Sequence, residues 1–160
     1  MTGRKGIKMF YAIAILVALI DQISKYLIRS YLHIGETASL WGIELTHYEN
    51  SGMARSLFQG YARLFGIAAV IFVAAVLYYR RTGQLKGLIL NCSLGFLVGG
   101  AVGNAIDRLL FGQVTDFLVS RSGKGILNFA DHAIEAGVLL LILHGVIQFT
   151  RKHFIKRKFS

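Results

Sequence analysis

The feature that most constrains the fold is a stretch of twenty consecutive residues, 87–106, that contains no charged side chain. A helix rises about 1.5 Å per residue, so this stretch can cross the ~30 Å hydrocarbon core of a bilayer. Three other segments are similarly apolar, beginning near residues 9, 64 and 136. We therefore expect an all-α membrane protein with four transmembrane helices, at approximately residues 8–28, 62–79, 87–107 and 129–150.

The distribution of charge predicts how these spans are oriented. Four spans place both termini on one side of the membrane, and the segments on that side hold eleven of the eighteen Lys and Arg residues and none of the eight Asp and Glu residues. By the positive-inside rule this side is cytoplasmic. The net charge of +10 then matches anionic lipid at that face, and we expect no nucleic-acid partner. The candidate chemistry lies toward the extracytoplasmic face.

The polar segments between the spans contain signals for β-structure. Residues 29–61 separate the first two spans; within them, residues 41–48 are rich in β-formers and roughly alternate, and residues 49–52 are typical of a turn. A second strand-like segment, 113–119, precedes the last span. We expect a single integral membrane domain over residues 1–160, with a small extracytoplasmic β-containing insert between helices 1 and 2.

Two aspartates, Asp116 and Asp131, lie among apolar residues next to the last span. Isolated carboxylates are costly near hydrocarbon, so they suggest a functional site. Each also has a simpler interpretation, because Asp131 could cap the last helix together with Asn128, and Asp116 could be an ordinary strand or loop residue. Two close carboxylates, however, share one proton. The ionised one could take a proton from water while the protonated one polarises a scissile carbonyl, and the helix N-terminus favours Asp131 as the base.

The end of the third span carries a small and polar face. At 100° per residue, five residues fall within an arc of about 140°: Gly100, Gly103, Asn104, Asp107 and Arg108. This face either packs against another helix or lines a polar cavity, with Asn104 and Arg108 as donors and Asp107 orienting Arg108. A repeated spacing of four residues also lets another helix approach closely, at Gly95, Gly99 and Gly103.

Asp21 and Lys25 lie four residues apart near the end of the first span. They could simply form an ion pair along the helix. Alternatively they lie, with Ser24, at the same depth as the two aspartates and contact the substrate or the residues around it.

Five sequence blocks resemble the lipoprotein signal peptidases (signal peptidase II), a family of bacterial aspartic intramembrane proteases. The blocks are D-Q-I-S-K at 21–25, N-S-G-M-A at 50–54, G-G-A-V-G-N-A-I-D-R at 99–108, V-T-D-F at 114–117 and N-F-A-D at 128–131. They occur in the family's order, and the likeness extends over nearly the whole chain.

The resemblance implies that Asp116 and Asp131 are the catalytic pair. It also implies that further residues bind substrate or surround the site: Asp21, Lys25, Asn50, Gly52, Ala54, Gly100, Asn104, Asp107, Arg108, Asn128 and Ala130. The implied substrate is a prolipoprotein whose lipobox cysteine carries diacylglycerol, cleaved just before that cysteine at the outer face of the bacterial cytoplasmic membrane. The family needs no metal or other cofactor, it works in contact with membrane lipid, and globomycin-type peptides inhibit it.

The same residues are also compatible with two other classes of protein. A metalloprotease could use Asp131, His132 and Glu135, but the spacing is not H-E-x-x-H, and His132 points about 100° away from Asp131 on a helix. A non-enzymatic polytopic protein is the other alternative, either a small proton-coupled transporter or an assembly subunit. Intramembrane carboxylates also serve transport, although here they cluster at one face and not at the middle of the bilayer.

Overall fold

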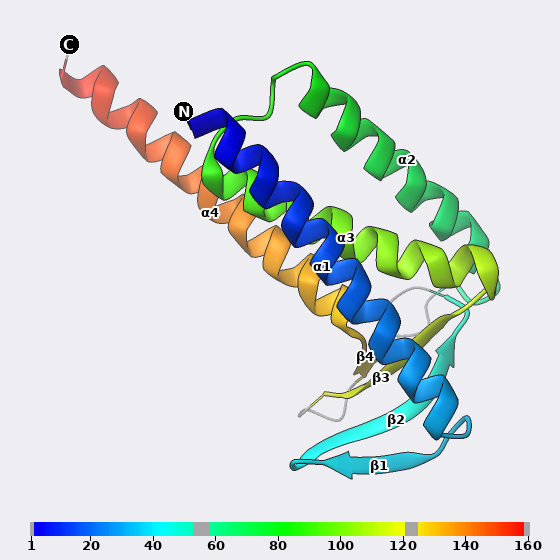
Figure 1. The fold of residues 1–160 in the computed structure, drawn as a ribbon. Coiled ribbons are helices and arrows are strands. Elements are labelled where there is room, and N and C mark those ends of the chain that lie inside the picture. Colours follow the sequence, from blue (N-terminus) through cyan, green and yellow to red (C-terminus); the bar gives the residue numbers. More distant parts are fainter. Residues whose placement is uncertain (1, 53–57, 121–124, 159–160) are drawn as a thin grey trace.

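The computed structural model describes residues 2–52, 58–120 and 125–158. These residues form four long helices: α1 (Thr2–Tyr31), α2 (Ala62–Arg81), α3 (Leu88–Leu110) and α4 (Phe129–Lys158). Figure 1 shows a bundle with both chain ends at one end and a small sheet at the other. All four described helices are long and apolar enough to cross a membrane, which confirms the predicted fold class. Helices α1 and α4 extend several residues beyond the predicted spans toward the chain ends.

Helix α3 lies at the centre of the bundle and packs against α1, α2 and α4 (Figure 1). Most of its membrane-crossing residues are buried, whereas those of the other three helices are largely exposed, as is expected of surfaces that face lipid. The buried apolar core is built from α1, α2 and α3: Phe10, Ala14, Val76, Leu94, Leu97 and Val98. The helix with the longest uncharged run is therefore the one that the others surround.

Glycines on α3 allow two helices to approach its backbone, as their spacing predicts. A Cβ atom on Gly99 would lie 2.8 Å from the carbonyl oxygen of Ala14 in α1. A Cβ atom on Gly100 would lie 2.5 Å from the carbonyl oxygen of Ala130 in α4. Neighbouring stripes of α3 therefore hold α1 and α4 at close range, which brings the first turn of α4 next to the polar end of α3.

We expect Gly100→Ala to destabilise the protein by about 1–3 kcal/mol, because the added methyl group would force α4 away from α3. Gly145→Ala is a matched control on α4, since a Cβ atom at that position meets nothing within 4 Å. The control should be neutral or slightly stabilising, as glycine is a poor helix former. Thermal unfolding in detergent micelles compares the two variants. Equal melting temperatures would show that the α3–α4 contact has room for a side chain.

A four-stranded antiparallel sheet covers one end of the described bundle. Its strands are β1 (Thr37–Leu40), β2 (Ile43–Asn50), β3 (Val114–Val119) and β4 (Ile126–Leu127), in the spatial order β1-β2-β3-β4. The predicted strand at 113–119 is confirmed by β3. The sheet is not confined to the insert between α1 and α2, because β3 and β4 come from the connection between α3 and α4. Pairing of β2 with β3 places residues of the insert beside Asp116, whose partner in register is Tyr48.

The predicted strand at 41–48 begins two residues too early. Trp41 and Gly42 form the turn of the β1–β2 hairpin, with φ angles of 51° and 79°. Two-residue hairpin turns of type I′ need positive φ at both positions, because their twist matches that of the flanking strands. The requirement of the turn therefore overrides the strong β-propensity of tryptophan, and the Trp41 side chain is exposed.

Candidate active site

Asp116 and Asp131 come from different elements that meet at the sheet end of the bundle. Asp116 lies in β3, and Asp131 lies in the first turn of α4. Asn128, just before α4, contacts both: its side-chain amide donates to Asp116 Oδ1 at 2.6 Å, and its side-chain oxygen accepts from the backbone N–H of Asp131 at 2.9 Å. The two predicted catalytic aspartates therefore share one asparagine.

Both carboxylate oxygens of Asp131 accept hydrogen bonds. Oδ1 accepts from the side-chain amide of Asn104 in α3 at 2.9 Å, and Oδ2 accepts from the backbone N–H of Asn128 at 3.2 Å. The reciprocal bonds between Asn128 and Asp131 form the capping arrangement considered from the sequence. The cap is compatible with a catalytic role for Asp131. It fixes the half-buried side chain at a helix N-terminus, where a negative charge is favoured.

Asp116 is the more buried of the two aspartates, with 3% of its surface exposed. Its Oδ2 accepts from the side-chain amide of Asn50 at 3.0 Å, and its Oδ1 accepts from Asn128. Burial and, to a smaller extent, the nearby charge of Asp131 raise the pKa of Asp116 to about 7, even though the hydrogen bonds from Asn50 and Asn128 lower it. Asp116 is thus able to hold a proton at neutral pH next to the hydrogen-bonded carboxylate of Asp131.

A buried cluster of charges lies behind Asp131. Lys25 Nζ is 2.7 Å from Asp21 Oδ2 and 3.3 Å from Asp107 Oδ2, and all three side chains are fully buried. The same Nζ donates to Asn104 Oδ1 at 2.9 Å, and Asn104 in turn donates to Asp131. Asp21 and Lys25 therefore do pair along α1, and the pair also fixes the amide that holds Asp131.

The same cluster joins α1 to the start of α4. Asp21 Oδ1 accepts from the backbone N–H of Ala130 at 2.8 Å. Ala130 is fully buried, and its carbonyl is the group that approaches Gly100 on α3. Ser24, by contrast, donates to the carbonyl of Asp21 within its own helix and makes no link to α3 or α4 in the described structure.

The expectation that Asp107 orients Arg108 is wrong. The Asp107 carboxylate contacts Lys25 and Arg29 of α1, and also accepts from Gln22 and from the backbone N–H of Thr115. The reason is geometric, because neighbouring residues on a helix point about 100° apart. The charge of Arg108 interacts more strongly with Asp131 and Asp116 than with Asp107, and its Nε is buried without a hydrogen-bond partner among the described residues.

Two further predicted site residues lie in the segment after β2. The backbone N–H of Gly52 donates to Asn50 Oδ1 at 3.0 Å, which turns the amide nitrogen of Asn50 toward Asp116. Ala54 lies outside the described residues. The structure therefore brings the described members of the predicted set together on α1, α3, the sheet, the first turn of α4 and the residues that adjoin β2 and α4.

Three residues that contact Asp107 are not among those expected from the sequence. Gln22 Nε2 donates to Asp107 Oδ1 at 3.2 Å, Arg29 NH1 is 3.5 Å from the same oxygen, and the Thr115 backbone N–H donates to Oδ2. A signal for Arg29 was present, because it follows Lys25 by four residues and so shares its helix face. No comparable signal identifies Thr115, whose position depends on strand pairing.

The residues of the metalloprotease alternative do not converge. His132 Nδ1 lies 3.2 Å from Glu135 Oε2, and both side chains are about half exposed, while Asp131 faces Asn104. Within the described ranges, no three His, Cys, Asp or Glu side chains lie close enough to share a metal ion.

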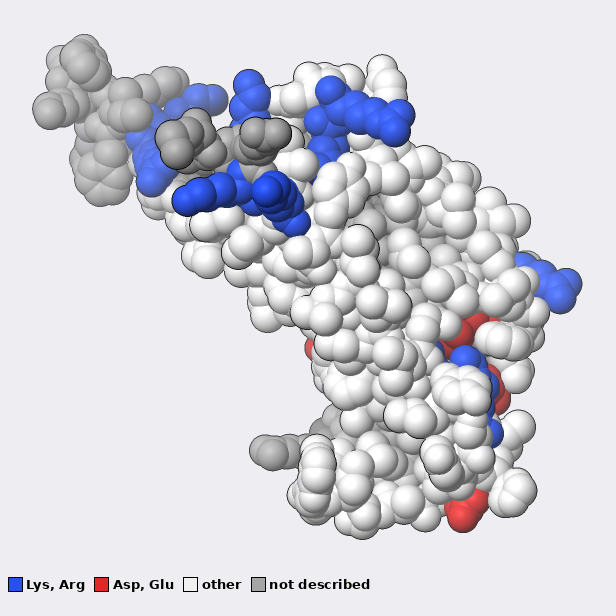
Figure 2. All heavy atoms as spheres, in the orientation of Figure 1, with Lys and Arg blue, Asp and Glu red and all other residues white. Residues whose placement is uncertain are grey.

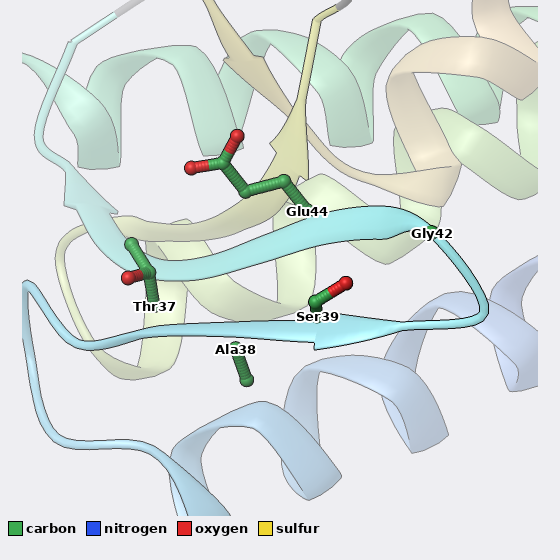
Figure 3. Close-up of a pocket in the computed structure, with 5 residues that line it drawn as sticks. All are labelled: Thr37, Ala38, Ser39, Gly42 and Glu44. Carbon is green, nitrogen blue, oxygen red and sulfur yellow. The ribbon is translucent and has the colours of Figure 1, made fainter.

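An open hollow of about 420 Å³ lies on the β1–β2 hairpin and is separate from the aspartates. It is lined by Thr37, Ala38, Ser39, Gly42 and Glu44 (Figure 3). Ser39 and Glu44, which are partners in register, point to the same side of the hairpin, whereas Ala38 points to the other. None of these side chains contributes to the cluster around Asp116 and Asp131.

Comparison with known proteins gives a consistent family assignment. A family model described as Signal peptidase (SPase) II matches residues 13–147. A lipoprotein signal peptidase of Shouchella clausii (strain KSM-K16) is 33% identical over 142 residues, covering 88% of this chain and 94% of the relative. A lipoprotein signal peptidase of Geobacillus thermodenitrificans (strain NG80-2) is 34% identical over 140 residues, covering 84% and 88%. A solved bacterial membrane enzyme, determined by the in meso method at 2.3 Å resolution, superposes with a TM-score of 0.84 at 30% identity, covering 91% and 92%.

Proposed function

Because the chain belongs to the signal peptidase II family of bacterial multi-pass membrane peptidases, we propose that it removes the signal peptide from prolipoproteins that carry diacylglycerol on the lipobox cysteine. Cleavage falls just before that cysteine. Family membership sets aside the transporter and assembly-subunit alternatives. The observation that carries the proposal within the site is the pair of aspartates joined by Asn128, one buried with a pKa of about 7 and one hydrogen-bonded at a helix N-terminus.

The proposed reaction uses Asp131 as the base and Asp116 as the acid. Asp131 takes a proton from water as the water oxygen bonds to the carbonyl carbon of the scissile peptide, and Asp116 gives its proton to the carbonyl oxygen. The resulting tetrahedral diol collapses when the C–N bond breaks. Asp131 then passes its proton to the leaving amine, and a hydroxyl proton of the diol returns to Asp116. One water molecule is consumed and both aspartates regain their starting forms.

We place this reaction at the extracytoplasmic face, with both termini in the cytoplasm. Figure 2 shows the larger share of the visible Lys and Arg at the end of the bundle that holds the termini, whereas the visible Asp and Glu side chains lie toward the sheet end, with some basic side chains beside them. The positive-inside rule supports this orientation. Diacylglycerol chains on the substrate would then remain in the outer leaflet, beside the exposed apolar surfaces of the helices.

Cleavage of a purified substrate tests the proposed function. We expect the purified protein to cut a diacylglyceryl-modified prolipoprotein before the modified cysteine, to leave the unmodified precursor largely intact, and to be blocked by a globomycin-type peptide. A chelator should have no effect on the rate. Equal cleavage of both precursors would contradict the proposed substrate class, and no cleavage of either would contradict the proposed activity.

The raised pKa of Asp116 predicts the basic limb of the pH profile. Asp116 must be protonated to act as the acid, so turnover should fall as the pH rises through about 7, by roughly tenfold per pH unit above it. The amide of Asn50 stabilises the ionised form, so Asn50→Ala should raise the pKa of Asp116 and move this limb to higher pH. Rates of cleavage between pH 5 and 9 give the midpoint of the limb for each protein. A limb that stays in place, or moves to lower pH, would argue against Asp116 as the acid.

A further inference from the structure

A second polar cluster lies on the face of the β2–β3 ladder opposite to Asp116. Consecutive residues of a strand point to opposite faces, so Thr115 faces away from Asp116, and Glu49 faces away from Asn50. Glu49 and Thr115 are partners in register across the two strands. The pair of strands therefore carries the Asn50–Asp116 contact on one face and a Glu49–Thr115 contact on the other.

Glu49 is the centre of this cluster. Its Oε1 accepts from the hydroxyl of Thr115 at 2.9 Å and lies 2.8 Å from His47 Nε2. The hydroxyl oxygen of Thr115 accepts in turn from Arg29 NH1 at 2.9 Å. We call these four residues, Arg29, His47, Glu49 and Thr115, the polar bracket. None of them belongs to the set around the two aspartates.

Both ring nitrogens of His47 contact oxygen atoms. His47 Nδ1 lies 2.8 Å from the carbonyl oxygen of Leu32, which can only accept, and Nε2 faces the carboxylate of Glu49. The contact of His47 Nδ1 with Leu32 therefore ties β2 to the residue following α1, and the contact of Nε2 joins the same ring to Glu49.

Arg29 and Thr115 tie the other strand to the helices. The Arg29 guanidinium lies over the ring of Phe111 at 4.7 Å, at the end of α3, while it donates to Thr115. The backbone N–H of Thr115 donates to Asp107 of α3. A single residue next to Asp116 is thus bonded to β2, α1 and α3 at once, and it is fully buried.

We propose that the polar bracket positions Asp116 for catalysis by fixing the register and depth of β3 against α1 and α3. This inference rests on the proposed function and extends it, because Arg29, His47, Glu49 and Thr115 act as positioning residues and do not touch the reacting atoms. Hydrogen bonds from Asn128 and Asn50 orient the carboxylate of Asp116, and the polar bracket holds in place the backbone of β3, which carries Asp116. Displacement of a catalytic group by about 1 Å is enough to lower turnover by about a hundredfold.

Thr115→Val tests the bracket, because valine keeps the branched shape and strand preference of threonine and replaces the hydroxyl with a methyl group, which cannot form a hydrogen bond. We expect kcat to fall by about ten- to a hundredfold while KM stays within about twofold, and we expect Thr115→Ser to recover most of the loss. Thr46→Val is the matched control, since Thr46 is a buried threonine of β2 whose hydroxyl donates to the carbonyl of Glu36 and takes no part in the bracket. This control should keep a kcat close to wild type.

Arg29→Met and the double variant measure the coupling within the bracket. Arg29→Met removes the partly exposed donor to Thr115, so it reports on the bracket even if Thr115→Val does not fold. The double variant should be no slower than the slower single variant, because both changes break one chain of hydrogen bonds. Wild-type kcat in Thr115→Val or Arg29→Met, an equal loss in Thr46→Val, or additive losses in the double variant would overturn the inference. Each of these results leaves cleavage by the wild type, and so the proposed function, intact.

Discussion

Asp131→Asn is expected to lower the rate of cleavage by at least about a thousandfold while the protein remains folded. An amide does not take a proton from water, so the attacking water would lose its base. The two groups that donate to Asp131, Asn104 and the backbone of Asn128, face one oxygen each, and an asparagine offers only one acceptor. The substitution should therefore also cost about 1 kcal/mol of stability. That is too little to explain the loss of turnover.

Asp116→Asn should be equally inactive, for the complementary reason that it cannot donate the proton that Asp116 holds. Glu135→Gln is the matched control, because it neutralises an exposed carboxylate one turn further along α4. Single-turnover cleavage and melting temperature are measured for all three variants. One general acid or base contributes at least about a hundredfold to the rate. If either Asn variant kept more than about a tenth of the wild-type rate, the assignment of Asp131 as the base and Asp116 as the acid would be contradicted.

The sequence predicts the helices and the pairing of Asp21 with Lys25 far better than it predicts the sheet. Long uncharged segments specify the four helices, and the glycines of α3 specify which helix the others approach. The spacing of Asp21 and Lys25 predicts their pairing, because residues four apart on a helix are neighbours. These features are local, so they can be read from neighbouring residues along the chain.

The parts that the sequence does not predict depend on contacts between distant segments. Asp107 bonds to Lys25 and Arg29 and not to Arg108, because the approach of α1 to α3 decides which cations face it. The pairing of Glu49 with Thr115 needs the register of β2 on β3, which joins the insert to a segment more than sixty residues later. No periodicity along the sequence indicates the register of β2 on β3, so the polar bracket could be recognised only in the structure.

The buried cation at the centre of the site predicts the largest effect on stability. Lys25 lies within 3.3 Å of both Asp21 and Asp107, and none of the three side chains reaches the surface. Lys25→Met preserves the length of the side chain and removes the charge, which leaves Asp21 as a buried carboxylate without its cation. Removal of one partner from a buried ion pair typically costs about 3–5 kcal/mol, so we expect the free energy of unfolding to fall by that amount. Asn104 would lose its donor as well, and with it the orientation of the amide that holds Asp131.

Two comparisons separate the charge effect from a general effect of the substitution. Lys8→Met makes the same change at an exposed position of the same helix and should alter stability by less than about 0.5 kcal/mol. Asp21→Asn added to Lys25→Met should recover part of the lost stability, because the unpaired charge is removed while Asn Oδ1 can still accept from the backbone of Ala130. Unfolding in detergent, followed by the loss of helical signal, gives all three values. If the double variant were less stable than Lys25→Met alone, the cost would lie in lost packing around Lys25 and not in an uncompensated charge, and Asp21 would be held by α4 instead of by the cation.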